Sequence, residues 1–182
     1  VQFGDMTCNK QEGTARICFG NMGPGGLQPH CDGSIQSLRT FLQHWQVDHY
    51  GGCEHQMNLD NIPPYHRLHE IFHSENALRC IAAHNKNSND HNFRQQGGTM
   101  SMTMGEMASR HHTSGKDATG LGWWVWQLFK GKNNITTRIY TAYRPCKTHP
   151  KQLKTVYNLQ RAYFRDKGID RCPRELFLED LE

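Results

Sequence analysis

The sequence contains no long hydrophobic stretch and no paired cysteine motif. Nothing in its 182 residues approaches the roughly 18 consecutive apolar residues of a transmembrane helix, and no secretory signal pattern opens it. The seven cysteines are odd in number and never arranged as Cys-x-x-Cys, which argues against a disulfide framework or a cysteine-rich zinc module. We therefore expect reduced thiols in an intracellular protein, cytoplasmic or nuclear, with no membrane partner.

A strong excess of charge of one sign is also missing. The 21 Lys and Arg against 17 Asp and Glu give a net charge of +4, which permits an anionic partner without demanding one, because nucleic-acid-binding proteins usually carry a denser basic patch. The length fits one domain with a sizeable core. Residues 1–15 are polar and rich in turn formers and are predicted to be a tail, which leaves 16–182 as the domain. Nothing in the sequence specifies an oligomeric state.

The first feature that the sequence does contain is a predicted strand, helix and second strand in succession. "RICFGNM" (16–22) predicts a buried strand, and the apolar spacing from Ile35 to Trp45 predicts a helix with Ser34 as its N-cap. "VDHYGGCE" predicts another strand that ends at Glu54. This order with short connections is typical of a βαβ unit, and hence of a parallel strand pair.

The remaining sequence adds further helices and strands. A helix is predicted over 65–73, and "GGTMSMTMG" predicts a half-buried strand because methionines alternate with Ser101 and Thr103. "WWVWQLFKG" and "TTRIYTAYRP" flank the turn-forming "GKNNI" and predict an antiparallel hairpin. Two more helices are predicted, over 152–167 and from Pro173 onward. The mixture indicates an α/β or α+β fold.

The most recognisable motif is His69-Glu70-x-x-His73. Two histidines four residues apart on a helix can hold Zn²⁺, while the glutamate acts as a general base on metal-bound water. Against this, Asn76 stands where the longer metalloprotease motif has glycine, and a chain with 12 histidines produces such pairs by chance. A zinc hydrolase and a scaffold helix are the two interpretations of this segment.

A second constellation lies at the ends of predicted strands. Asn21, Glu54 and Tyr143 each follow a strand, and ligands gather at strand ends in α/β sheets. A carboxylate suits Mg²⁺, which takes oxygen ligands, and a tyrosine hydroxyl can donate a hydrogen bond to a phosphoryl oxygen. Each residue also has an ordinary structural explanation, as a turn residue, a solvated carboxylate or a packed ring.

The order of these segments resembles the endonuclease/exonuclease/phosphatase superfamily, the DNase I-like fold. "RICFGNMGPGGL" and "VDHYGGCEH" resemble its first two strands, which end in a catalytic Asn and a metal-binding Glu. "GGTMSMT" and "TRIYTAYRP" resemble later strands, the second with a tyrosine that faces the phosphate. The stretches "GKDATGLGWWVWQLFKGK" and "CPRELFLEDL" are similar to a subgroup found in retroelement-type reading frames.

The resemblance implies a four-layer α/β sandwich and metal-dependent hydrolysis of phosphodiesters by a nuclease. It implies that Glu54 binds Mg²⁺ or Mn²⁺, that Asn21 positions the phosphate or water, and that Tyr143 hydrogen-bonds the phosphate. Arg110 and Arg144 are candidates to contact the backbone of a nucleic acid, DNA in preference to RNA.

The sequence departs from this family in one important respect. The family's remaining acidic and histidine residues follow its tyrosine strand, and the sequence contains no "GDFN"-like string. We therefore expect these 182 residues to be the N-terminal portion of such a domain, with little activity in isolation. The alternatives are a noncatalytic remnant of the same fold that binds nucleic acid or protein, and the zinc hydrolase.

Overall fold

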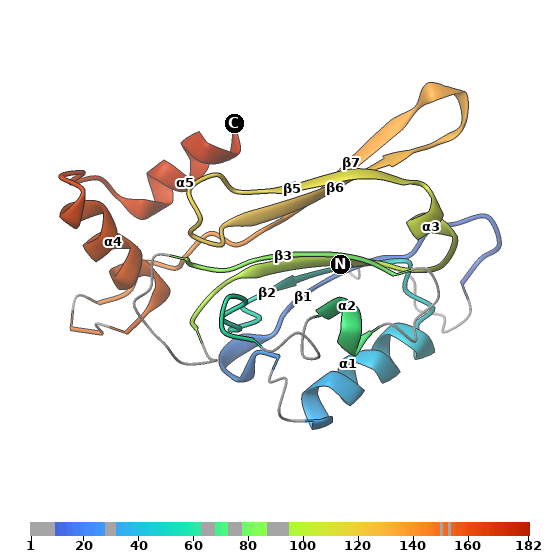
Figure 1. Cartoon of the computed structure of the whole chain (residues 1–182), viewed down its shortest axis with the longest axis horizontal. Helices are drawn as coiled ribbons and strands as arrows, with labels where there is room; N and C mark the ends of the chain where they lie inside the picture. The colour runs from blue at the N-terminus through green and yellow to red at the C-terminus, as the bar shows by residue number, and fades with distance from the viewer. Residues whose placement is uncertain are drawn as a thin grey trace, which may run out of the picture.

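Two β-sheets stacked face to face form the centre of the molecule (Figure 1). The computed structural model describes residues 10–27, 32–62, 68–72, 78–86, 95–149, 151–152 and 154–182. The first sheet has the strand order β1-β2-β4-β3 and the second the order β5-β6-β7. The strands of the first sheet are β1 (Ile17–Asn21), β2 (His49–Cys53), β3 (Arg79–Ala83) and β4 (Thr99–Thr103). Those of the second sheet are β5 (His111–Lys116), β6 (Trp124–Lys130) and β7 (Thr136–Ala142).

The predicted βαβ unit is confirmed. β1 and β2 pair in parallel, and α1 (Asp32–His44), which begins at Asp32 and not after Ser34, connects them. Together with the short helix α2 (Leu68–Ile71), α1 covers the outer face of the first sheet (Figure 1). Leu42, Phe72 and the alternate methionines of β4 are buried in the core beneath these helices.

The layer between the two sheets contains a buried polar network beside apolar side chains such as Val125 and Phe129. Ser101 and Thr103 of β4 both donate to the Gln127 side chain of β6, the first at 3.2 Å, and His49 Nδ1 lies 2.8 Å from the Thr103 hydroxyl. The strand predicted over 97–105 is present as β4, but all of its residues are buried, so only the prediction of half-burial is wrong. The second sheet covers the face of β4 that carries the Ser and Thr side chains. These hydroxyls can be buried because each of them has a hydrogen-bond partner.

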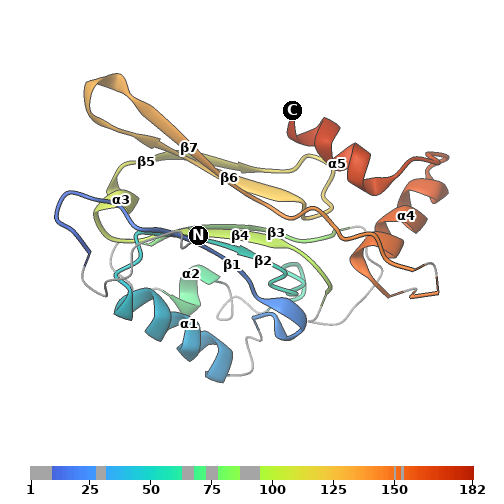
Figure 2. The same ribbon diagram turned by 180° about the vertical axis from the view of Figure 1, so that it is seen from behind.

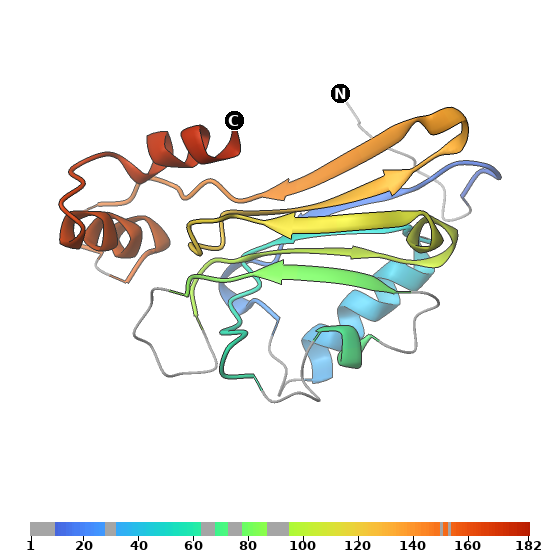
Figure 3. The ribbon, with the colours of Figure 1, turned by 45° about the horizontal axis from the view of Figure 1, so that its top comes forward.

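The hairpin and the C-terminal helices agree with prediction. β6 and β7 pair antiparallel around the turn that contains the 3-10 helix Lys132–Asn134. α4 (Val156–Asp166) begins after the N-cap Thr155, and α5 (Pro173–Leu181) follows it. Both helices pack around the buried Trp123 at one end of the two sheets (Figure 3).

Several elements differ from the sequence prediction. β3, β5 and the helix α3 (Gly105–Ser109) were not predicted. β1 is an edge strand with one open face, where Phe19 is 60% exposed, because the second sheet packs over β2, β4 and β3. Figure 2 shows the side of the molecule where β1 and β7 lie.

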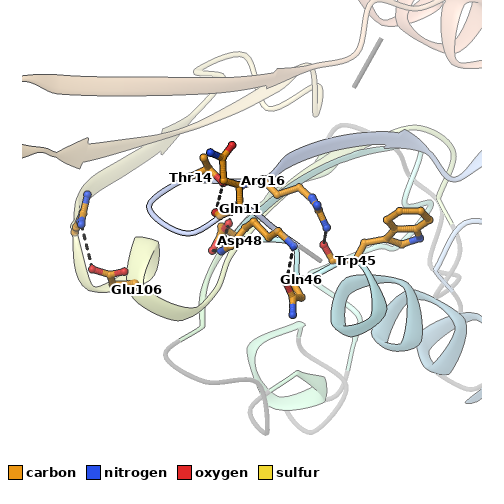
Figure 4. Close-up of polar contacts among 9 residues, drawn as sticks. Gln11, Thr14, Arg16, Trp45, Gln46, Asp48 and Glu106 are labelled. Atoms are coloured by element: carbon orange, nitrogen blue, oxygen red, sulfur yellow. Dashed lines mark hydrogen bonds and ion pairs between the residues drawn. The ribbon is translucent and has the colours of Figure 1, made fainter. Parts of the chain in front are cut away.

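Part of the predicted tail is fixed to the domain. Lys10 Nζ forms an ion pair with Asp48 at 2.7 Å, and the same carboxylate accepts a hydrogen bond from the Arg16 backbone N–H at 2.7 Å. The Arg16 guanidinium in turn donates to the carbonyl oxygen of Trp45 (Figure 4). These contacts hold the entry to β1 against the segment that leads into β2.

Candidate functional site

A cavity of about 340 Å³ opens where β2 and β7 end. Glu54 and Tyr143, which are far apart in the sequence, both line it. The other lining residues come from the turn after β2, the segment before β4, the segment after β7 and the start of α4: Gln56, Gln96, Gly97, Cys146, Thr148, Thr155, Val156 and Tyr157. The structure therefore brings together two of the three residues that the sequence predicted at strand ends.

Glu54 stands on a backbone turn that tertiary contacts hold in place. Its φ of 57° is in the left-handed region, which non-glycine residues seldom adopt. Its N–H donates to the Gly98 carbonyl at 2.8 Å. The next residue, His55, is fully buried; its Nε2 lies 2.8 Å from the Ala83 carbonyl oxygen and its Nδ1 accepts from the Met57 N–H. These bonds place Glu54 at the mouth of the cavity.

Tyr143 is held by contacts to its backbone and its ring. Its N–H donates to the Trp123 carbonyl at 2.8 Å. A β-carbon on Gly97 would lie 3.9 Å from its ring, an ordinary packing distance, and 3.3 Å from Val156, so the tyrosine ring and α4 both lie beside Gly97. Burial raises the pKa of the Tyr143 phenol, and the hydrogen bond to the Glu54 carboxylate and its negative charge raise that pKa further. The hydroxyl therefore keeps its proton at neutral pH.

Asn21 lies at the same sheet edge, although it does not line the cavity. It is paired in register with Cys53 on the neighbouring parallel strand. Its Oδ1 accepts a hydrogen bond from the Gly23 N–H at 2.7 Å, and its side chain is exposed. Asn21 thus stabilises the turn after β1, with its amide on the solvent side of the strand end.

The two arginines proposed from the sequence lie in different places. Arg144 directly follows Tyr143 and is exposed. Arg110 follows α3, at the opposite end of the sheets from α4 (Figure 1), and forms a 3.2 Å ion pair with Glu106. Only Arg144 is close in sequence to the cavity-lining residues, so Arg110 belongs to a separate surface.

Basic residues gather along the segment between β7 and α4, and three of the four were not singled out from the sequence. The stretch from 144 to 155 contains four Lys and Arg residues and no Asp or Glu: Arg144, Lys147, Lys151 and Lys154. Lys151 and Lys154 line an adjoining hollow of about 510 Å³ that shares Gln96 and Thr155 with the first. The N-terminus of α4, whose dipole favours anions, opens onto the same place. The rim of the cavity is therefore electropositive around one carboxylate.

Two cysteines near the site differ in accessibility. Cys146 is exposed and lines the cavity. Cys53 precedes Glu54, and burial, with a smaller effect of the Glu54 charge, raises the pKa of its thiol to about 11. In the described part of the chain, all five cysteines are free thiols.

The donor set of the cavity suits Mg²⁺ or Mn²⁺ better than Zn²⁺. Glu54 is the single acidic residue among the described lining residues, and Gln96 adds an amide oxygen. Mg²⁺ is commonly held by one or two carboxylates, with waters and substrate phosphates completing its shell. The residues present therefore fit an ion that is bound together with a phosphate. Within the described ranges, no cluster of three or more His, Cys, Asp and Glu residues could hold a metal.

The His69-Glu70 segment shows no zinc site in its described part. α2 ends at Ile71, and His73 lies outside the described residues. His69 Nε2 lies 3.1 Å from the carboxylate of Glu70, and both side chains are exposed. Leu68 and Phe72 are buried in the core. This arrangement fits the scaffold interpretation of the helix.

Comparisons with known proteins provide no family assignment. No model of a protein family matches the sequence, and no curated protein is significantly similar to it. Across the described segments, no helix is both long and apolar enough to cross a membrane. The functional argument therefore rests on the geometry of the cavity.

Proposed function

We propose that the chain carries part of the active site of a metal-dependent phosphodiester hydrolase that acts on nucleic acid, DNA in preference to RNA, within a DNase I-like four-layer fold. The supporting observation is that Glu54 and Tyr143 line one cavity with an electropositive rim. These are the residue types that the sequence suggested for binding a metal and a phosphate.

Each residue has a distinct role in this proposal. The Glu54 carboxylate would hold Mg²⁺ or Mn²⁺, an ion that supplies Lewis-acid polarisation of a phosphoryl oxygen. The Tyr143 hydroxyl, which is hydrogen-bonded to Glu54 in this structure, would donate instead to a phosphate oxygen as negative charge develops there. Arg144 and the lysines up to Lys154 bind the flanking backbone phosphates. Asn21, at the neighbouring strand end, would orient the phosphate or the attacking water.

A noncatalytic binding module is the second candidate function. It is favoured because the described lining residues contain one carboxylate and no histidine that could serve as a general base. On either account we expect slow or no hydrolysis by these 182 residues alone. Rapid Mg²⁺-dependent cleavage of DNA by the purified chain would contradict that expectation.

Metal binding in the presence of DNA tests the proposal directly. We expect Mn²⁺, followed by electron paramagnetic resonance with a short DNA duplex, to bind the Glu54→Gln variant at least about 10-fold more weakly than the native chain. This follows from the loss of the one charged ligand. Glu70→Gln is the matched control, because Glu70 is exposed and remote in the fold, and it should bind Mn²⁺ normally.

The outcomes separate the candidates. Tyr143→Phe should leave Mn²⁺ binding intact and weaken DNA binding about 3- to 10-fold, the effect of one hydrogen bond. Equal Mn²⁺ affinity in native and Glu54→Gln chains would overturn the metal site. DNA binding that needs no metal and survives Glu54→Ala would establish the binding module.

A further inference from the structure

The outer face of the three-stranded sheet carries a row of aromatic and basic side chains. Along β6, alternate residues Val125, Gln127 and Phe129 are buried between the sheets, so the others point outward. The outward set on β6 is Trp124, Trp126, Leu128 and Lys130. In register with it on β7, Tyr140 is opposite Trp126 and Arg138 is opposite Leu128.

These side chains form one connected surface. The Arg138 guanidinium lies over the Trp126 ring, 4.6 Å from its centroid, and its Nη1 is 3.2 Å from the Tyr140 hydroxyl. The rings of Tyr140 and Trp124 are 6.1 Å apart at an interplanar angle of 65°. Trp126 also packs against the bare backbone of Gly115, where a β-carbon would lie 2.7 Å from its ring. The rings are therefore positioned before any ligand arrives.

Much of this surface is open to solvent. Tyr140 is 40% exposed, and Trp124 and Trp126 are half-buried. At one edge of the face Asp180 of α5 accepts a hydrogen bond from Trp124 Nε1 at 2.7 Å, and Trp124 also packs against the cluster around Trp123. Figures 1 and 3 show α5 near one end of these strands and no helix lying across them.

The charge of the second sheet has a single sign. β5, β6, β7 and the turn 131–135 contain Lys116, Lys130, Lys132 and Arg138, and no Asp or Glu. An apolar helix covering this face would bury Arg138 and Lys130 without an acidic partner from this sheet, which is costly. A ligand with negative charges and flat rings matches both the positive charge and the exposed aromatic rings of this face.

We propose that this face binds single-stranded nucleic acid. Bases stack on Tyr140, on Trp124 and on the guanidinium plane of Arg138 that covers Trp126, since unpaired bases stack on aromatic rings and on arginine planes. Lys130 and Lys132 neutralise the backbone phosphates. The face is separate from the Glu54 cavity and requires no hydrolysis. It shares with the proposed function only the chemical class of the partner.

Binding of a labelled 12-nucleotide oligothymidine, followed by fluorescence anisotropy without divalent metal, tests the proposal. We expect Tyr140→Ala to weaken binding about 10-fold, the usual effect of losing one stacked base. Arg138→Gln, and Trp126→Ala, which removes the ring that supports the Arg138 guanidinium, should weaken it similarly. Phe19→Ala is the matched control, because Phe19 is a more exposed aromatic residue on the other sheet, and it should bind normally. Tyr140→Phe keeps the ring and should also bind normally.

Two further results bear on the proposal. A DNA duplex of the same length should bind this face more weakly, because its bases are already stacked on one another. Glu54→Gln should not change oligothymidine binding, so failure of the metal site and failure of this face are distinguishable.

Normal binding by Tyr140→Ala and Arg138→Gln chains that retain native circular dichroism would overturn the proposal. Self-association that Tyr140→Ala abolishes, in a chain that binds no oligothymidine, would also overturn it and would mark a protein interface.

Discussion

At the residue scale, the cavity depends on a backbone conformation that its own residues do not favour. Glu54 and Gln56 have φ values of 57° and 56°, a region that costs a non-glycine residue on the order of 1 kcal/mol or more. His55 lies between them, and both of its ring nitrogens are hydrogen-bonded inside the protein. The buried imidazole is therefore a structural anchor for the turn that presents Glu54.

Two buried histidines should make the fold sensitive to acid. Burial lowers the pKa of His49 and of His55 from 6.5 to about 4, so the folded state keeps both rings neutral while the unfolded state protonates near pH 6.5. The contribution of each neutral ring to the free energy of unfolding is therefore fully present above pH 6.5. It is lost as the pH falls toward 4, by up to about 3 kcal/mol for each residue. Urea unfolding at pH 7.5, 5.5 and 4.5 measures this loss. A free energy of unfolding that stays constant over this range would contradict the prediction.

Cysteine reactivity reports the environment of the cavity. At pH 7.5 we expect a maleimide to modify Cys146 at least about 10-fold faster than Cys53, because the thiolate is the reactive species and Cys53, whose pKa is about 11, is half-buried beside Glu54 whereas Cys146 is exposed. Mass spectrometry of peptides from the folded chain gives both rates. In guanidinium chloride the difference should disappear. Comparable rates in the folded chain would show that Cys53 is exposed.

At the element scale, the close approach of the two sheets depends on small residues in β2 and β4. Gly51 faces β7 across the interface, and the hydroxyls of β4 meet Gln127 of β6. A longer side chain on either strand would separate the sheets and carry Tyr143 away from Glu54. The same packing thus supports the fold and the cavity.

Gly51→Ala should therefore destabilise the protein. A β-carbon at this position would lie 2.4 Å from the Thr141 hydroxyl and 2.5 Å from the Phe19 ring, and overpacking of this kind costs about 1–3 kcal/mol. Urea unfolding measures the loss. Gly25→Ala is the control, since nothing lies within 4 Å of its β-carbon, and its stability should match that of the native chain. Equal stability of the two variants would show that the sheets can separate without cost.

At the scale of the whole molecule, the two sheets are offset. The three-stranded sheet packs over β2, β4 and β3, and β1 keeps an open face on which Ile17 and Phe19 are 44% and 60% exposed. β1 was predicted as a buried strand because its sequence is apolar. The prediction of a strand was right and that of its burial was wrong, because burial depends on which elements of the opposite sheet reach it.

Local sequence patterns determined most of the individual elements. Helical spacing predicted α1, α4 and α5, turn residues between apolar runs predicted the β6–β7 hairpin, and the order strand, helix, strand predicted the parallel pair. β3 and β5 were missed because neither "RCIAA" nor the polar "HHTSGK" alternates apolar and polar residues with a clear period of two. β5 is a strand because its backbone pairs with β6, which is a tertiary property.

The sequence by itself determined that Glu54 and Tyr143 end strands, since a strand's end is marked by residues within a few positions of it. Only the tertiary structure decided that the two residues share a cavity, that Asn21 does not line it, and that Thr155 and Gln96 do. It also decided that Trp126, Arg138 and Tyr140 form one surface, because register and sheet packing fix which side chains meet. Distances between residues far apart in the chain depend on the packing of whole layers, and no local propensity encodes them.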